Sequence, residues 1–193
     1  SNIANQLRAT VGGGEQNSAS GYDASTVSGG LNNTASGNQS TIGGGANNQA
    51  TQSNSFVGGG TGNIVSNSES SIVGGSGNNV SANQSFVGGG LSNTASGVAS
   101  VVVGGQQNIA SGYRSSIGGG YYNVADGISS SIIGGDYNNT NGNNNSHIIG
   151  SNIYADRSDC AFVENLSITS IPTSAVGLPS GSLWSNAGVI NIV

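Results

Sequence analysis

The segment SSIGGGYYNVADG (residues 115–127) places three consecutive glycines after an isoleucine. Glycine gives a strand no side chain to pack, and it loses more backbone entropy on folding than any other residue. The chain nevertheless holds 35 glycines among 193 residues. A folded chain of this composition must recover that entropy through a regular scheme, so the spacing of residues around this segment is the first clue to the fold.

The pattern of this segment recurs every fifteen residues, and we call the residues at one position of the repeat a column. One column contains only Val or Ile: Val27, Ile42, Val57, Ile72, Val87, Val102, Ile117 and Ile132. Columns of Ser, Gly and Asn begin at Ser25, Gly29 and Asn33 and keep the same step. An earlier copy around Val11 is one residue out of step, and a degenerate copy at 145–147 ends the array. Unbroken columns of this kind indicate a repeat architecture rather than a disordered chain.

A fifteen-residue unit is too short for a pair of helices, but it fits one coil with two short strands and two turns. We expect strands at S-x-[VI] and N-x-A-S, with the Val27 and Ala35 columns pointing inward and with Gly and Asn in the turns. The sequence therefore predicts an all-β protein, a parallel β-solenoid of about nine coils. The expected divisions are a lead-in at 1–10, the repeat domain at 11–150 and a C-terminal segment at 151–193.

The outward positions beside the Val/Ile column alternate between large and small residues with a thirty-residue period. Phe56 and Phe86 are followed two residues later by glycine, and Val or Ile takes that second position in the coils between. Such alternation suits close packing, and an exposed apolar stripe marks an interface. We expect self-association through these residues: Phe56, Val73, Phe86, Val101, Val103 and Ile133.

The composition changes after Gly150, where Trp184, both prolines and Cys160 occur. CAFVENLSI (160–168) is typical of a strand, and GSLWSNAGVINIV (181–193) of a hairpin that turns near residues 186–188. We expect residues 151–193 to form a small β cap that closes the solenoid and aligns the associated chains.

The charge composition argues against several functions. Only 6% of the residues are charged, the net charge is −5 and there is no lysine, so nucleic-acid binding is not expected. No apolar run is long enough to span a membrane. The single His147 and the scattered acidic residues form no catalytic or metal-binding pattern. We expect no enzyme activity, no cofactor and no metal.

Five of the six tyrosines lie in the second half of the chain, from Tyr113 to Tyr154. Tyr121, Tyr122 and Tyr137 occupy turn positions, where their rings should be exposed. Tyrosine stacks on the apolar face of a sugar and amides bond its hydroxyl groups. The candidate glycan-binding residues are Tyr113, Tyr121, Tyr122, Tyr137, Asn138 and Asn139. Packing of these rings over a neighbouring coil or chain is the alternative.

Two repeats, SSIGGGYYNVADG and QSFVGGGLSNTASG (84–97), resemble the head repeats of YadA-like trimeric autotransporter adhesins, which also occur in phage and virus fibre proteins. The resemblance covers about residues 8–150 and implies a left-handed β-roll that forms a parallel homotrimer. The final stretch GLPSGSLWSNAGVINIV (177–193) resembles the closing segment of viral fibre proteins.

Three functions are consistent with these features. The first is a structural and adhesive virion fibre, located on the virion surface, with a host receptor, possible host glycans and other virion proteins as partners. The second is the head of a bacterial trimeric autotransporter adhesin, located on the bacterial outer surface. The third is an ice-binding solenoid, which would require a regular outward Thr array; the Phe and Val residues of the outward positions interrupt such an array.

Overall fold

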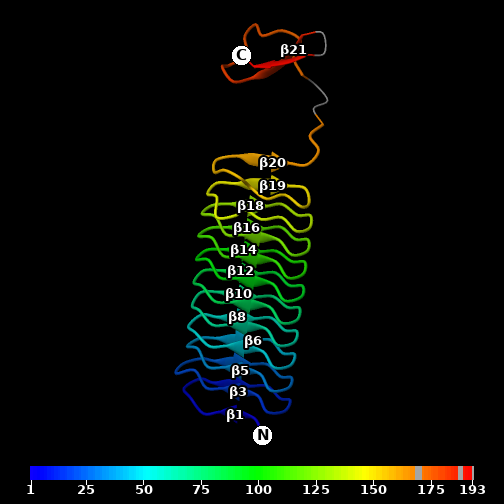
Figure 1. Cartoon of the computed structure of the whole chain (residues 1–193). Helices are drawn as coiled ribbons and strands as arrows, with labels where there is room; N and C mark the ends of the chain where they lie inside the picture. The colour runs from blue at the N-terminus through cyan, green and yellow to red at the C-terminus, as the bar shows by residue number, and fades with distance from the viewer. Residues whose placement is uncertain (168–170, 187–188, 193) are drawn as a thin grey trace.

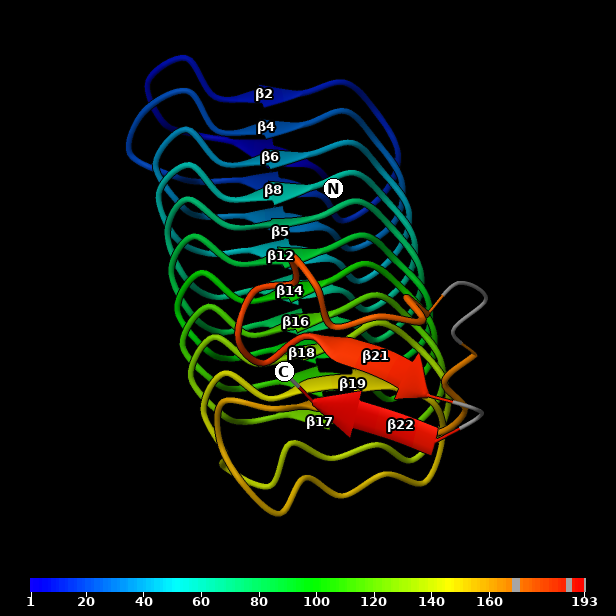
Figure 2. The same cartoon turned by 90° about the horizontal axis from the view of Figure 1, so that it is seen from above.

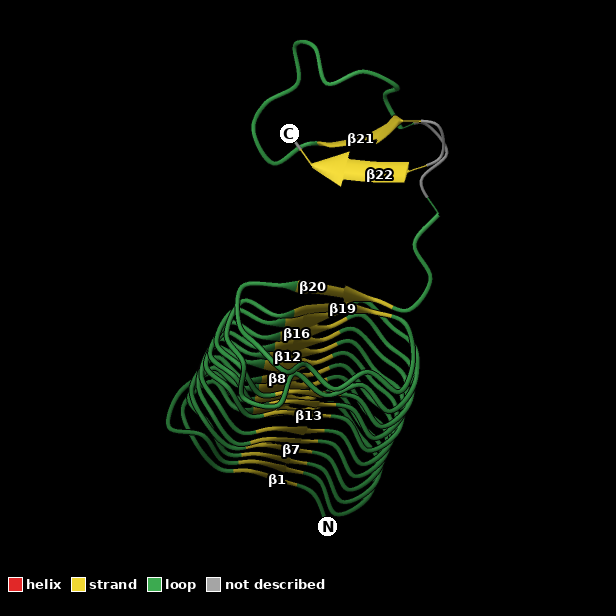
Figure 3. Cartoon of the chain, turned by 45° about the horizontal axis from the view of Figure 1, so that its top comes forward, coloured by secondary structure: helices red, strands yellow, loops and turns green. Residues whose placement is uncertain are grey.

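The computed structural model describes residues 1–167, 171–186 and 189–192, and it confirms an all-β parallel solenoid. Figure 1 shows the chain winding as a stack of flattened coils from the N-terminus to β20, with a hairpin beyond the last coil. Strands of successive coils lie one above another, so that they form two continuous sheets (Figure 3). Among the described residues there is no helix, and hence none that could cross a membrane.

Each of the first nine coils contributes one short strand to each sheet, and the last two contribute β19 and β20 to the larger sheet alone. Figure 2 shows the stacked coils from above. The nine-stranded sheet comprises β1 (Ile3–Ala4), β3 (Ser18–Ala19), β5 (Thr34–Ala35), β7 (Gln49–Ala50), β9 (Ile64–Val65), β11 (Asn79–Val80), β13 (Thr94–Ala95), β15 (Ile109–Ala110) and β17 (Val124–Ala125). The eleven-stranded sheet comprises β2 (Thr10–Val11), β4 (Thr26–Val27), β6 (Thr41–Ile42), β8 (Phe56–Val57), β10 (Ser71–Ile72), β12 (Phe86–Val87), β14 (Val101–Val102), β16 (Ser116–Ile117), β18 (Ser131–Ile132), β19 (His147–Ile149) and β20 (Ala161–Val163).

The solenoid has about eleven coils, so the expected number of about nine is too low. The extra coils lie at the two ends, where the fifteen-residue step changes. Thr10 pairs with Thr26, sixteen positions on, and His147 pairs with Ala161, fourteen positions on. Ile153 and Phe162 pack against the core. Small changes of step are absorbed in the turns. The copies around Val11 and at 145–147 are full coils of the stack, and β20 adds a further coil past Gly150, the expected end of the repeat domain.

The interior of the solenoid is built from four columns rather than two. The Val27 and Ala35 columns are buried, as expected, and they form one continuous apolar core. The Ser25 and Asn33 columns are buried as well. The burial of these two polar columns was not predicted. Asparagine occurs in the turns, as expected, but at the residue before the repeated Asn, for example at Asn32 with φ of 53°.

The buried asparagines form a hydrogen-bonded ladder along the whole stack. In the coil of Asn78, the side-chain amide donates to Gly74 O at 3.0 Å and to Gly90 O at 3.1 Å. Its Oδ1 accepts the backbone N–H of Asn93 at 2.9 Å. The same pattern begins at Asn2, whose Oδ1 accepts Asn17 N, and ends at Asn138, whose Oδ1 accepts Ile153 N. Between these two ends, each asparagine thus gives a donor to a turn carbonyl of its own coil and a second donor to a turn carbonyl of the next coil, which also accepts a backbone N–H.

Steric contacts with the next coil explain two of the three glycines at Gly58–Gly60. A Cβ on Gly58 would lie 2.3 Å from the carbonyl oxygen of Val73 in the next coil. A Cβ on Gly60 would lie 2.1 Å from Gly75 O, and the φ of Gly60 is +88°. Two of the three positions therefore require glycine because successive turns approach each other closely.

Gly60→Ala should destabilise the solenoid by about 3 kcal/mol, since it adds a backbone clash to a left-handed φ. Gly62→Ala is the matched control, because Gly62 has a φ of +65° but nothing within 4 Å of an added Cβ. Gly62→Ala should lower the free energy of unfolding by about 1 kcal/mol. Urea unfolding followed by circular dichroism compares the two variants, and equal losses would contradict the steric account.

The C-terminal segment contains an antiparallel hairpin of β21 (Leu183–Asn186) and β22 (Val189–Ile192), as expected. Its turn at 187–188 and the end of the strand expected at 160–168 lie outside the described residues. Within the expected strand, β20 pairs in parallel with β19 and so continues the solenoid past residue 150. The predicted cap at 151–193 therefore begins within the solenoid. Figure 1 shows the hairpin beyond β20, and a closing role for the rest of the cap, residues 166–193, stays a prediction.

Candidate functional site

The first candidate surface is an apolar stripe on the outer face of the eleven-stranded sheet. Strand register places Phe56, Phe86 and Val101 in one outward column of this face. Val73, Val103 and Ile133 directly follow β10, β14 and β18 and form a second column beside it. Phe56, Val73, Val103 and Ile133 expose 41%, 51%, 57% and 63% of their surface, and Phe86 and Val101 are half-buried. We call these six residues the outer stripe. Contiguous apolar exposure of this kind is uncommon on a soluble monomer.

The large-and-small alternation of the outer stripe has a cause within the chain. The ring of Phe56 lies over Gly58, where an added Cβ would be 3.4 Å from Cε1, and Phe86 lies over Gly88 in the same way. A Cβ on Gly88 would also lie 2.3 Å from the carbonyl oxygen of Val103 in the next coil. The alternation alone is therefore no evidence of an interface, and the argument for one rests on the exposure of the stripe.

A column of glycines lies directly beside the outer stripe, two positions after each inward Val or Ile; these are the middle glycines where the coil has three glycines. The column runs from Gly29 to Gly134 without exception. At Gly59, Gly74 and Gly104 an added Cβ would meet nothing within 4 Å. Close approach inside the chain therefore does not explain these glycines, in contrast to those on either side of them.

The second candidate surface is a cluster of three tyrosines in the turns that follow β16 and β18, which we call the tyrosine cluster. The rings of Tyr122 and Tyr137 are stacked, with centroids 5.6 Å apart and planes at 6°. Tyr121 meets both rings edge-on, at 4.3 Å and 5.4 Å between centroids. The pKa of Tyr121 is raised, because burial and the neighbouring hydroxyls of Tyr122 and Tyr137 disfavour its phenolate.

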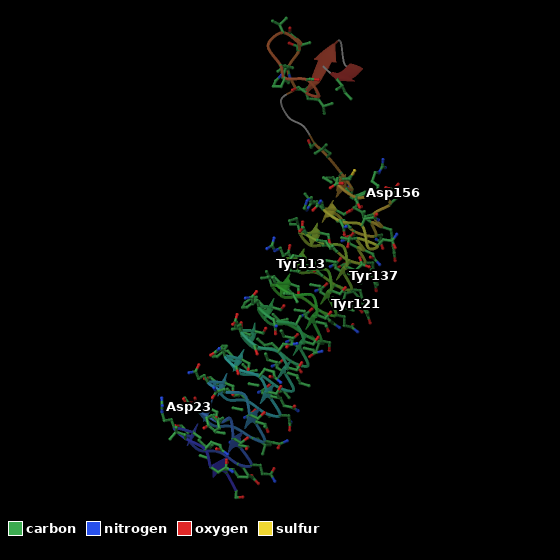
Figure 4. The ribbon with its side chains drawn as sticks, turned by 90° about the vertical axis from the view of Figure 1, so that its left-hand side faces the viewer. Asp23, Tyr113, Tyr121, Tyr137 and Asp156 are labelled. Atoms are coloured by element: carbon green, nitrogen blue, oxygen red, sulfur yellow. The ribbon has the colours of Figure 1, made fainter. Side chains whose placement is uncertain are left out.

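The remaining predicted glycan-binding residues do not join this cluster. Tyr113 lies in the turn between β15 and β16, on the opposite side of the stack, as Figure 4 shows. There Cζ of Arg114 is 4.9 Å from its ring centroid. Asn138 is buried, and its amide donates to Gly134 O and Gly150 O, so its prediction as a ligand contact is wrong. Asn139 is half-buried and accepts the backbone N–H of Asn141.

Polar residues that the sequence analysis missed surround the tyrosine cluster. The column of Tyr121 continues with Gln106 below and Asp136 above, joined by backbone bridges. The column of Tyr122 and Tyr137 continues with Gln107 below and Asn152 above. The fifteen-residue step gives these neighbours directly, once the turn columns are followed from coil to coil.

Neither the family models nor the curated proteins that were compared match this chain. The candidate surfaces are therefore interpreted from their own chemistry and from the repeat itself.

A third feature is a hollow of about 530 Å³ beside β19, lined by Ser129, Asn145, His147, Asp159, Cys160 and Ala161. The Nδ1 atom of His147 lies 2.7 Å from Ser131 Oγ, and the Asn145 amide donates to Asp159 at 2.7 Å. Within the described ranges, no three His, Cys, Asp or Glu side chains gather as metal ligands would. The polar groups of this hollow bond to one another, so it is a weaker candidate than the stripe or the cluster.

Proposed function

We propose that this chain forms the rod of a homotrimeric surface fibre, with three parallel solenoids packed through the outer stripe. The observation that carries the proposal is the exposure of Phe56, Val73, Val103 and Ile133 on one face of the rod. From Thr26 to Ile149 the outward positions of this face hold no Asp, Glu, Lys or Arg. Interface cores are similarly depleted of charge and enriched in aromatic side chains.

The column of middle glycines also supports this face as the interface between chains. Glycine allows another backbone to approach closely. Since nothing in the chain itself approaches Gly59, Gly74 or Gly104, a second copy of the chain is the partner that this column fits. The trimeric state rests on the resemblance to YadA-like repeats. The closing role of residues 166–193 is part of the same proposal.

The preference for a virion fibre rests on the C-terminal stretch that resembles viral fibre ends. The alternative is the head of a bacterial trimeric adhesin. An antibody against the protein, followed by immunogold electron microscopy, distinguishes these functions: label on virus particles supports the first, and label on bacterial cell surfaces supports the second.

An ice-binding function finds less support in the geometry. The outward column of the eleven-stranded sheet contains Phe56, Phe86 and Val101 among its Thr and Ser residues. The outward column of the nine-stranded sheet mixes Thr34 and Thr94 with Gln49, Ile64 and Asn79. Neither face presents a regular Thr array.

The interface is tested by adding charge to the outer stripe. The double variant Val73→Asp, Val103→Asp should be a folded monomer of 18.8 kDa, because two carboxylates per chain would be buried without partners in the trimer. The matched control is Asn79→Asp, Thr94→Asp, which places the same charge on half-buried outward positions of the other sheet. Sedimentation velocity measures both masses. A stripe variant that remains associated, or a control that dissociates equally, would contradict the proposed face.

A further inference from the structure

The tyrosine cluster carries one inference beyond the rod, and the first step is its backbone. Tyr122 and Tyr137 have φ of 52° and 55°, in the left-handed region. The same column is left-handed in earlier coils, whether it holds Asn32, Asn47, Gly62, Gly77, Ser92 or Gln107. The left-handed turn is therefore a property of the fold, and it places the side chains of Tyr122 and Tyr137 at the same position of consecutive coils.

The second step is the shape and exposure of the rings. Tyr122 and Tyr137 expose 41% and 47% of their surface, although they stack on each other. One face of Tyr137 is turned to Tyr122, so its other face is directed towards the next coil, where the same column holds Asn152. Tyr121, edge-on to both rings, fixes the pair from the side. The result is a preformed aromatic platform that would lose little conformational entropy on binding.

The third step is the polar surroundings. Gln106 and Gln107 lie one coil below the rings, and Asp136 and Asn152 lie one coil above or beside them. Amides offer both donors and acceptors, and a carboxylate accepts hydrogen bonds from hydroxyl groups. A ring platform flanked by such groups matches a saccharide, which has an apolar face and a rim of hydroxyls.

The fourth step is the charge. Asp136 is exposed beside the cluster. The three arginines of the chain lie elsewhere: Arg8 pairs with Asp23, Arg114 lies at the opposite turn and Arg157 pairs with Asp156. An anionic sugar would find a carboxylate and no cation here, so the site favours a neutral one.

We propose that the tyrosine cluster, with Gln106, Gln107, Asp136 and Asn152, is a binding site for neutral saccharides on a host surface. This proposal rests on the proposed fibre function, since it assigns the contact that a fibre makes. It differs from the sequence prediction in the residues it uses: Tyr113, Asn138 and Asn139 have no part in it.

The variants that test this site exploit the repeat. Tyr122→Asn, Tyr137→Asn restores the residue that the same column holds at positions 32 and 47, so this double variant should melt no lower than the unmodified protein. Tyr137→Phe keeps the ring and should keep binding. Tyr113→Ala removes an exposed tyrosine from the opposite turn and is the matched control.

The assay is a glycan microarray in which each neutral N-acetyllactosamine chain is paired with its sialylated form. The unmodified protein should be retained on neutral spots and be at least about tenfold weaker on the sialylated partners. The variant Tyr122→Asn, Tyr137→Asn lacks both stacked rings and should bind neutral glycans about tenfold more weakly. Tyr113→Ala should bind them as the unmodified protein does. Retention on sialylated spots alone, no retention on neutral spots, or unchanged binding of the double Asn variant would each overturn the site.

The mass of the same samples separates this proposal from the fibre proposal. A trimer that retains no neutral glycan removes the saccharide site and leaves the rod intact. Dissociation of the double Asn variant would show that the rings pack against a second chain, and this result too would overturn the site.

Discussion

Replacing Val102 with aspartate should leave no folded solenoid. Val102 is fully buried, and in the eleven-stranded sheet it pairs with Val87 in one neighbouring coil and Ile117 in the other. A carboxylate at this point would be surrounded by aliphatic side chains with neither a cation nor a donor, and such burial costs more than about 4 kcal/mol. Because each coil pairs with the coils on either side of it, the loss of structure should spread to both neighbouring coils.

The control for this substitution is the adjacent residue. Val103 is 57% exposed, so Val103→Asp should fold and show the circular dichroism of the unmodified chain. Asn47→Asp, at an exposed turn position, should change stability little. Thermal unfolding of the three variants tests this assignment. A Val102→Asp variant that melts no lower than Val103→Asp would mean that the inward and outward columns are misassigned.

Asn78→Asp should be nearly as damaging, although it changes only one side-chain nitrogen to oxygen. The amide of Asn78 donates to Gly74 O and Gly90 O, and a carboxylate would instead place negative charge against these two carbonyl oxygens. Gly74 O loses its donor, Gly90 O keeps only the backbone N–H of Ser76, and the buried charge has the N–H of Asn93 as its remaining partner. We expect a loss of at least about 4 kcal/mol at neutral pH.

The neighbouring residue again provides the control, because Asn79 points outward from β11 and is half-buried. Asn79→Asp makes the same chemical change and should cost less than about 0.5 kcal/mol. The buried aspartate should have a raised pKa, so Asn78→Asp should recover part of its stability as the pH falls and the carboxyl becomes protonated. Equal urea midpoints for the two variants at pH 7 would refute the asparagine ladder.

The solenoid could be predicted from sequence because its columns are regular. The fifteen-residue step, the Val27 and Ala35 columns and the two strands per coil are all found in the structure. The burial of Asn33 was missed because asparagine usually marks a turn. Strand alternation would have corrected this: if Ala35 points inward, Asn33, two residues earlier, must point inward as well.

The candidate site was predictable in part, for the same reasons. Tyr121, Tyr122 and Tyr137 were expected in exposed turns, and the structure brings these three rings together. Asn138 was assigned to the site wrongly because it belongs to the buried ladder. The stacking of Tyr122 on Tyr137 and the position of Tyr113 at the other turn depend on the path of the coil, which single-sequence spacing does not contain.

The oligomeric mass of the unmodified protein tests the central claim most directly. Multi-angle light scattering coupled to size exclusion should give three times the chain mass of 18.8 kDa, which is 56.4 kDa, because the outer stripe should be covered by other copies of the chain. A stable, folded species of 18.8 kDa at micromolar concentration would contradict the homotrimeric rod.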